Sequence, residues 1–414
     1  MKKYFWVYAF AALLMGGFVA SCSDDDPEIE VPEKPETKPE EKPEEKPVVC
    51  PIATTTFSGV KGLSLTYSGQ PLLGKQVVFT PNKENATKAT LVLSGVVPSS
   101  KGMDLNLPSS GIVPGETTTT LNIDLKIDGE TVSFEGKEEN ESRAIAYKGQ
   151  ATKDVLTLEL TVSMHENALT NKKFAPVAVV ERDSLNTAGQ SPLTLQWLST
   201  STIPFLGNPA NDINNLLVLA QSFPIVPVTE KEKVTIGKAL ELILQDVTFL
   251  ADGNIQATYK DSLTDNQWKT SPLNMATYTV ESENKMRVFI NADQIMAFEQ
   301  SKASRAGVAD LVTVLMAKAS ELLVKGVVVT FEEKNGVMQF YLDKETMLPI
   351  LNVLVPFLKD EQFYKEVTAM LGGILGPQMM PIIEQLALPI LKAMPGVIEG
   401  TTSMHFGLNM TAAK

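Results

Sequence analysis

The sequence predicts an α+β protein: a β-rich first domain, built as an antiparallel barrel or sandwich, followed by an α+β domain with apolar C-terminal helices. Three observations predict it. Residues 54–165 alternate apolar and polar side chains and are rich in Thr and Val, which is typical of half-buried strands. Helical and strand-like patterns alternate after residue 191. Residues 347–398 form the most apolar long segment outside the N-terminal region.

Residues 1–21 are organised like a secretory signal, with Lys2 and Lys3 ahead of a short apolar run. Val19-Ala20-Ser21-Cys22 resembles a bacterial lipobox, which implies that Cys22 carries a lipid and becomes the mature N-terminus. The acidic Ser23-Asp24-Asp25-Asp26 resembles the export signal of Bacteroidetes surface lipoproteins. These resemblances imply a lipid-anchored outer-membrane protein, on the cell surface or alternatively on the periplasmic face, whose only membrane contact is the lipid.

Residues 22–50 are expected to be a disordered tether. Prolines alternate there with Glu and Lys, and no apolar pattern could form a core. At about 3.1 Å per residue in polyproline conformation, the tether would hold the folded body some 50–80 Å from the membrane.

Charge and cysteine content exclude several function classes. The formal net charge is −13, and residues 23–47 account for eleven acidic and four basic side chains. The folded remainder is also acidic, so a nucleic-acid partner is not expected. Lipidation of Cys22 would leave Cys50 without an intrachain partner. With two cysteines and the distant His165 and His405, no metal site is expected, and no cofactor motif is intact.

The first domain is assigned to residues 51–190. Its expected strands are Val60–Tyr67, Gln76–Thr80, Lys88–Leu93, Thr119–Ile127, Thr131–Glu135, Ala144–Lys148 and Val155–Val162. The segments Gly62–Gly69, Gly74–Pro81, Ala89–Leu93 and Val113–Gly115 resemble the calycin-like domains of Bacteroidetes lipoproteins. The resemblance implies a small β-barrel in a family with no assigned activity.

The second domain is assigned to residues 191–414, with an irregular, Pro-rich entry near Leu193–Leu198. Its expected helices are Asp212–Gln221, Thr235–Gln245, Gly307–Lys325, Lys344–Phe357, Asp360–Leu371 and Gln378–Ala393. Its expected strands are Asn254–Lys260, Met275–Glu281, Lys285–Asn291, Gly326–Glu332, Gly336–Leu342 and Thr401–Met410. The Asn335-Gly336 pair predicts a tight hairpin turn.

The C-terminal helices are interrupted by prolines and apolar on most faces, so something must bury them. They could pack on the domain's own sheet, meet a partner protein, or bind an apolar small molecule. Flexible methionines suit an irregular ligand surface. The ligand hypothesis names Leu351, Leu354, Met370, Met379, Met380 and Ile383.

No catalytic constellation is intact, so the chain is expected not to be an enzyme. Gly69–Gln76 approaches a phosphate-binding loop, but Gln76 replaces the required Ser or Thr. His165-Glu166 lacks the second histidine of a zinc protease. A hydrolase based on two carboxylates remains an alternative, with Asp246, Asp252, Asp261, Asp265 and Asp293 as candidates.

The leading interpretation is a non-catalytic binding module for an apolar or amphipathic ligand. A surface adhesin or glycan-capture protein is the alternative, which an exposed cluster of Trp197, Trp268 and Tyr259 would favour. Asp183-Ser184-Leu185 and Asp261-Ser262-Leu263 resemble the Bacteroidetes O-glycosylation motif, which implies modification at Ser184 and Ser262.

Overall fold

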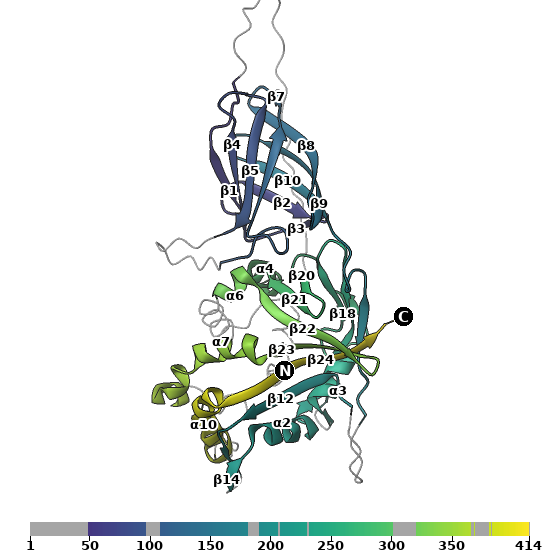
Figure 1. The fold of residues 1–414 in the computed structure, drawn as a ribbon, viewed down its shortest axis with the longest axis vertical. Helices are drawn as coiled ribbons and strands as arrows, with labels where there is room; N and C mark the ends of the chain where they lie inside the picture. The colour runs from purple at the N-terminus through teal and green to yellow at the C-terminus, as the bar shows by residue number, and fades with distance from the viewer. Residues whose placement is uncertain are drawn as a thin grey trace, which may run out of the picture.

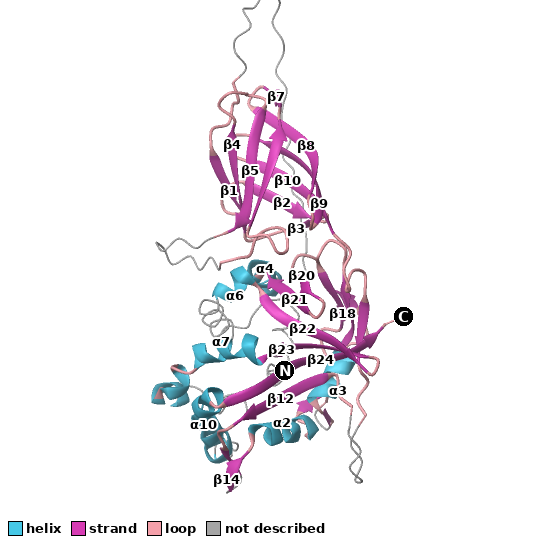
Figure 2. Ribbon diagram, viewed as in Figure 1, coloured by secondary structure: helices cyan, strands magenta, loops and turns pink. Residues whose placement is uncertain are grey.

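The chain forms a mostly β protein with several antiparallel sheets, a curled half-barrel sheet and a few short helices (Figures 1 and 2). The computed structural model describes residues 49–96, 108–180, 190–205, 208–229, 232–300, 320–365, 368, 381 and 383–413. We call residues 49–164 the first lobe and residues 165–413 the second lobe. The signal, Cys22 and residues 23–48 lie outside the described residues. Cys50, the last residue assigned to the tether, is instead partly buried against the first-lobe core.

The first lobe consists of two sheets that enclose one core. The four-stranded sheet has the order β1 (Thr55–Ser58), β4 (Lys75–Pro81), β5 (Lys88–Gly95) and β6 (Thr118–Asp124). The six-stranded sheet has the order β3 (Gln70–Pro71), β2 (Leu63–Tyr67), β10 (Leu156–Met164), β9 (Arg143–Ala151), β8 (Thr131–Glu139) and β7 (Lys126–Asp128). All pairs are antiparallel except β2 with β10, which are parallel.

Alternation of apolar side chains produces this core. In β6, Leu121 and Ile123 are buried, while the alternating polar residues Thr120, Asn122 and Asp124 are exposed. The sequence predicts one strand over Thr119–Ile127, and the structure corrects this: the chain passes at Leu125 from β6 to β7, which belongs to the other sheet. Leu125 is itself buried, so the crossing costs no core packing. The interior is filled by side chains such as Tyr67, Phe79 and Leu91.

The second lobe is built on a ten-stranded antiparallel sheet. Its order is β19 (Lys269–Thr270), β18 (Ile255–Tyr259), β17 (Leu244–Phe249), β11 (Lys173–Pro176), β24 (Thr401–Ala412), β23 (Val337–Asp343), β22 (Val327–Lys334), β21 (Lys285–Ile290) and β20 (Ala276–Ser282), with β12 (Leu193–Ser199) also paired to β24. An isolated bridge joins Asn254 to Thr277, so the two ends of the curled sheet meet at that point.

Short helices and hairpins surround this sheet. The helical segments are α2 (Ile213–Ser222), α3 (Ile236–Ile243), α4 (Ala292–Gln300), α6 (Ser320–Lys325), α7 (Lys344–Leu354), the 3₁₀ turn η1 (Phe357–Lys359), the π-helical η3 (Ile383–Ala387) and α10 (Leu388–Glu399). Two small hairpins are β13 (Ile203–Phe205) with β14 (Asn208–Asn211), and β15 (Val226–Pro227) with β16 (Lys233–Val234). Figure 1 shows α2 and α10 at the end of the molecule away from the first lobe, and α7 at the side of the second lobe, level with β23.

Several expectations for the second lobe need correction. The irregular entry near Leu193–Leu198 is instead the strand β12, since its partner β24 lies some two hundred residues further along the chain. The expected helix Thr235–Gln245 is the shorter α3, which ends at Ile243, and β17 begins at the next residue, Leu244. β11, from the segment assigned to the first domain, pairs with β17 and β24 in the ten-stranded sheet. The Asn335-Gly336 turn is confirmed, with both residues at positive φ.

Asparagine side chains join the two lobes. Asn274 Nδ2 lies 3.1 Å from each of the carbonyl oxygens of Tyr67, Gln70 and Pro71. Asn291 Nδ2 donates to the Leu73 carbonyl at 3.1 Å. A backbone bond from Met164 N–H to the Ala251 carbonyl, 2.8 Å long, adds to them. Backbone groups of the first lobe thus find partners in the second.

A buried lysine and a close glycine lie at the same junction. Lys75 Nζ donates to the carbonyl oxygens of Ser110 at 2.8 Å and Gly111 at 3.3 Å. Burial lowers the pKa of Lys75 from 10.5 to about 8, although the Asp293 carboxylate opposes the shift. Gly74 has a φ of 71° and lies against Asp293, so that a Cβ would come within 2.1 Å of its Oδ2. Only glycine fits there.

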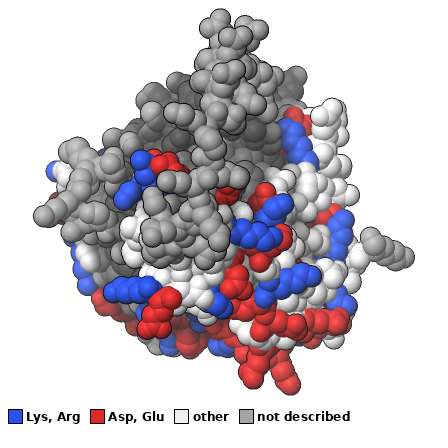
Figure 3. All heavy atoms as spheres, turned by 90° about the horizontal axis from the view of Figure 1, so that it is seen from above, with Lys and Arg blue, Asp and Glu red and all other residues white. Residues whose placement is uncertain are grey.

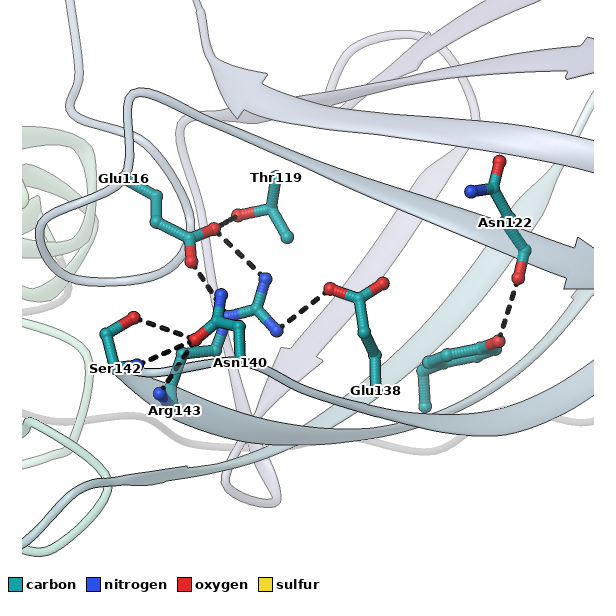
Figure 4. A network of polar contacts seen from close by, with 8 residues as sticks. Glu116, Thr119, Asn122, Glu138, Asn140, Ser142 and Arg143 are labelled. Atoms are coloured by element: carbon teal, nitrogen blue, oxygen red, sulfur yellow. Dashed lines mark hydrogen bonds and ion pairs between the residues drawn. The ribbon is translucent and has the colours of Figure 1, made fainter.

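A buried charge network lies in the first lobe (Figure 4). The Arg143 guanidinium, 3% exposed, donates to Glu116 at 2.8 Å and to Glu138 at 3.0 Å. Burial opposes the guanidinium charge, but the two carboxylates outweigh it and raise the pKa of Arg143. Thr119 donates to Glu116 and completes the network.

The surface mixes both signs of charge. Figure 3 looks along the long axis from the first-lobe end and shows Lys and Arg interspersed with Asp and Glu, with acidic groups gathered along one side. Among the described helices, none is both long enough and apolar enough to span a membrane.

We predict that Arg143→Met lowers the free energy of unfolding by about 2 kcal/mol, because it removes the charge-assisted hydrogen bonds of the partly buried Glu116, whose side chain is 21% exposed. The matched control is Lys88→Met, which removes an exposed pair with Asp124 and should cost below about 1 kcal/mol. Urea unfolding followed by circular dichroism measures both. Equal losses for the two variants would contradict the assigned role of the network.

We also predict that the protein becomes more stable between about pH 8 and pH 10. The pKa of Lys75 falls from 10.5 in the unfolded chain to about 8 in the folded chain. The folded chain therefore binds fewer protons in this window, and the free energy of unfolding rises with pH. At higher pH the raised pKa of buried Tyr67 acts in the opposite direction. Thermal unfolding of Lys75→Met should lack the rise, and an unchanged rise would refute the assignment.

Candidate functional site

The candidate site is an apolar cluster at the far end of the second lobe, formed by β12, β24 and four helical segments. We call it the helical apolar cluster. Its buried members are Trp197, Ile203, Ile213, Leu358, Val397, Ile398 and Met404. Its partly buried members are Leu216, Leu217, Met347, Leu348, Leu351, Leu354, Val355, Phe363, Ile390, Leu391, Ala393, Met394 and Phe406.

Two of the six predicted ligand residues are thereby placed in one cluster. Leu351 and Leu354 lie three residues apart on α7, and both pack against the cluster, as does Met394 on α10. Met370, Met379 and Met380 lie outside the described residues, and for Ile383 only the backbone is described, as the first residue of η3. Sequence reasoning missed the contributions of β12 and α2, which lie far from the C-terminal helices in the chain.

Local sequence signals start and interrupt these helices. Asp343 caps α7, its side chain accepting from the Thr346 N–H at 3.0 Å. Pro349 lies inside α7 and Pro395 inside α10, where each removes a backbone donor. The π-helical η3 leads directly into α10, and π-helical turns are frequent at functional sites. The helices are therefore short and irregular, as their prolines predict.

Trp197 is a buried member of the cluster and is only 5% exposed. Its indole Nε1 donates to Thr401 Oγ1 at 2.8 Å, and Thr401 donates in turn to the Val397 carbonyl at 2.8 Å. The ring of Phe406 meets the indole edge-on at 5.8 Å. The polar atom of Trp197 is thus satisfied, and the rest of the side chain presents an apolar surface.

The burial of this cluster differs from that of the first-lobe core. Nearly all members of the first-lobe core are buried, among them Val77, Leu91 and Leu156 at 0% exposure. In the helical apolar cluster, partly buried members outnumber buried ones. Among the described residues, it is therefore the less enclosed of the two.

The aromatic alternative does not assemble as one exposed cluster. Trp197 is interior, while Trp268 is 41% exposed with Lys260 Nζ 4.5 Å above its ring. Tyr259 packs against the second-lobe cores. Ser262 is partly buried with its hydroxyl 3.1 Å from that of Thr264, and Ser184 lies outside the described residues.

The chemical candidates have structural partners. Asp246 is 3% exposed, pairs with Lys173 at 3.0 Å and accepts from Thr258 at 2.9 Å. Asp261 pairs with Lys269. Asp252 accepts from the Asn254 N–H at 2.9 Å.

The remaining motif residues also take places in the fold. In the loop that approaches a phosphate-binding sequence, Lys75 is buried at the lobe junction. His405 lies on β24 with its ring 4.6 Å from that of Tyr341. Within the part of the chain that the structure describes, no group of three or more His, Cys, Asp or Glu side chains could hold a metal ion.

We predict that Thr401→Val destabilises the second lobe by about 1–3 kcal/mol, because the buried Trp197 Nε1 loses its acceptor. Thr401→Ser keeps the hydroxyl and should retain most of the stability. Tryptophan fluorescence during urea unfolding measures both variants. A larger loss in Thr401→Ser than in Thr401→Val would contradict the prediction, because Ser lacks only the methyl group and Val lacks only the hydroxyl.

Comparison with known proteins adds no relative. No protein-family description, curated protein or solved structure matches the chain.

Proposed function

We propose that this chain is a lipid-anchored envelope protein that binds an apolar or amphipathic small molecule at the helical apolar cluster, without catalysing a reaction. The observation that carries the proposal is the incomplete burial of that cluster, in which partly buried side chains from α2, α7 and α10 gather around Trp197. Sites for apolar ligands are lined mostly by hydrophobic and aromatic side chains, and this cluster has that composition.

The proposal assigns the two lobes different tasks. The first lobe, whose two sheets enclose a filled core, would connect the tether to the second lobe. The ligand would contact Leu351 and Leu354 on α7 and side chains of α10. The anchor at Cys22 and the outer-membrane location rest on the resemblance of residues 19–26 to a lipoprotein signal.

The proposal is tested through Trp197. In Trp268→Phe, removal of the signal with Trp6 leaves Trp197 as the only tryptophan of the mature chain. A brominated fatty acid such as 9,10-dibromostearate should then quench its emission in a saturable way. Native mass spectrometry of the protein from a Bacteroidetes host should show a stoichiometric lipid that disappears on solvent extraction.

Substitutions in the cluster give the matched comparison. Leu351→Ser and Leu354→Ser should each raise the dissociation constant obtained from the quenching curve about tenfold. This is the effect of losing one apolar contact of about 1.4 kcal/mol. Leu63→Ser, at a half-buried position against the first-lobe core, should leave it unchanged. A clean apo mass together with unquenched Trp197 would overturn the proposal and leave the cluster as ordinary core.

A further inference from the structure

Several large apolar side chains are exposed near the C-terminal end of α2 and directly after it. Leu219 is 38% exposed, Phe223 51% and Ile225 55%, and Pro224 between the last two is also exposed. We call these four residues the apolar tip. Earlier in the same helix, Leu216 and Leu217 pack into the helical apolar cluster. A group of large apolar side chains left in water marks an interaction surface.

The apolar tip is held by structure on both sides. Before it, α2 starts at Ile213 under the cap of Asp212, whose side chain accepts from the Asn214 N–H at 2.7 Å. Across Pro224, the N–H of Ile225 donates to the Phe223 carbonyl at 2.9 Å, which closes a tight turn. After it, Val226 is 1% exposed and pairs with Val234 in the hairpin β15–β16. The protein thus presents Phe223 and Ile225 on a fixed turn.

The segment is also free of charge. Residues 213–229 contain no Asp, Glu, Lys or Arg, in a chain in which 21% of residues are charged. Its exposed polar side chains are neutral, such as Asn215 and Ser222. Charged side chains are costly at membrane depth, whereas Phe, Leu and Ile favour the boundary of headgroups and acyl chains.

We propose that the apolar tip inserts into the surface of the bilayer to which the chain is anchored. The proposal rests on the proposed function, since it needs the lipid on Cys22. Residues 23–48, between that anchor and the described structure, span at most about 80 Å in extended polyproline conformation. This length keeps the bilayer at a high effective concentration around the protein, which favours the membrane over a second copy or a soluble partner.

Charge and continuity support the same occupant. Residues 213–229 carry no charged side chain, so insertion of the apolar tip brings no charge of this segment against anionic headgroups. Because α2 contributes to the helical apolar cluster through Leu216 and Leu217, insertion would bring the proposed ligand site beside the bilayer. An apolar ligand could then pass between membrane and protein without crossing open water.

The test places a tryptophan in the apolar tip of the full lipoprotein. Phe223→Trp in the Trp268→Phe background is reconstituted in vesicles of phosphatidylethanolamine and phosphatidylglycerol that contain brominated phosphatidylcholine. We expect the emission of the introduced tryptophan to be quenched and shifted to the blue, after the emission of Trp197 measured in the parent is subtracted. High salt should not reverse the quenching. Val155→Trp, at a first-lobe position 48% exposed, is the matched control and should stay unquenched. Ile225→Trp repeats the test with a second position.

Each outcome is distinguishable. Water-like, unquenched emission from both tip variants while the protein stays bound through its lipid would overturn the proposal. A blue shift without vesicles, together with a dimer mass in light scattering, would assign the apolar tip to a second copy and also overturn it. Failure of the proposed function is recognised separately, through Trp197 with soluble dibromostearate and through a missing lipid mass on the N-terminal peptide.

Discussion

The pairing of β24 with strands on both of its edges is the constraint on which the second lobe depends. One edge pairs with β11 and β12, and the other with β23. Residues from positions 173 to 412 are thereby brought into one sheet. Along one face of β24, Met404 and Phe406 enter the helical apolar cluster, while Leu408 and Met410 enter the core beneath the curled sheet. A single alternating strand therefore links the two apolar clusters.

The junction between the lobes is built from polar groups. Asn274 and Asn291 donate to backbone carbonyls of the first lobe, and Lys75 donates to the Ser110 carbonyl within that lobe. Such hydrogen bonds each stabilise the folded state modestly, whereas removing one partner leaves a buried polar group unsatisfied, which costs more. The polar junction and the apolar far end give the molecule two differently built regions. The described chain begins at Val49 in the first lobe, while α2 and α10, which contribute to the helical apolar cluster, lie in the second lobe (Figure 1).

Much of the fold could be predicted from local patterns, and much of the site could not. Strands β5, β9, β20, β21 and β23 lie where alternation places them, because their apolar faces point to a core. Leu351 and Leu354 were identifiable because a proline-broken apolar helix needs a covering partner. The roles of Trp197, Met404 and α2 were hidden, since no local pattern tells which distant strand or helix supplies that partner.

By itself, the sequence determined the alternation of β5 and β6, the Asn335-Gly336 turn and the short, broken character of the C-terminal helices, because each depends on neighbouring residues only. Only the tertiary structure decided that β11 and β12 join β24, that Lys75 is buried at a junction, and that Leu216 faces the cluster while Phe223 faces water. These outcomes depend on contacts between residues far apart in the chain. A contact of that kind forms only when the whole sheet closes around it.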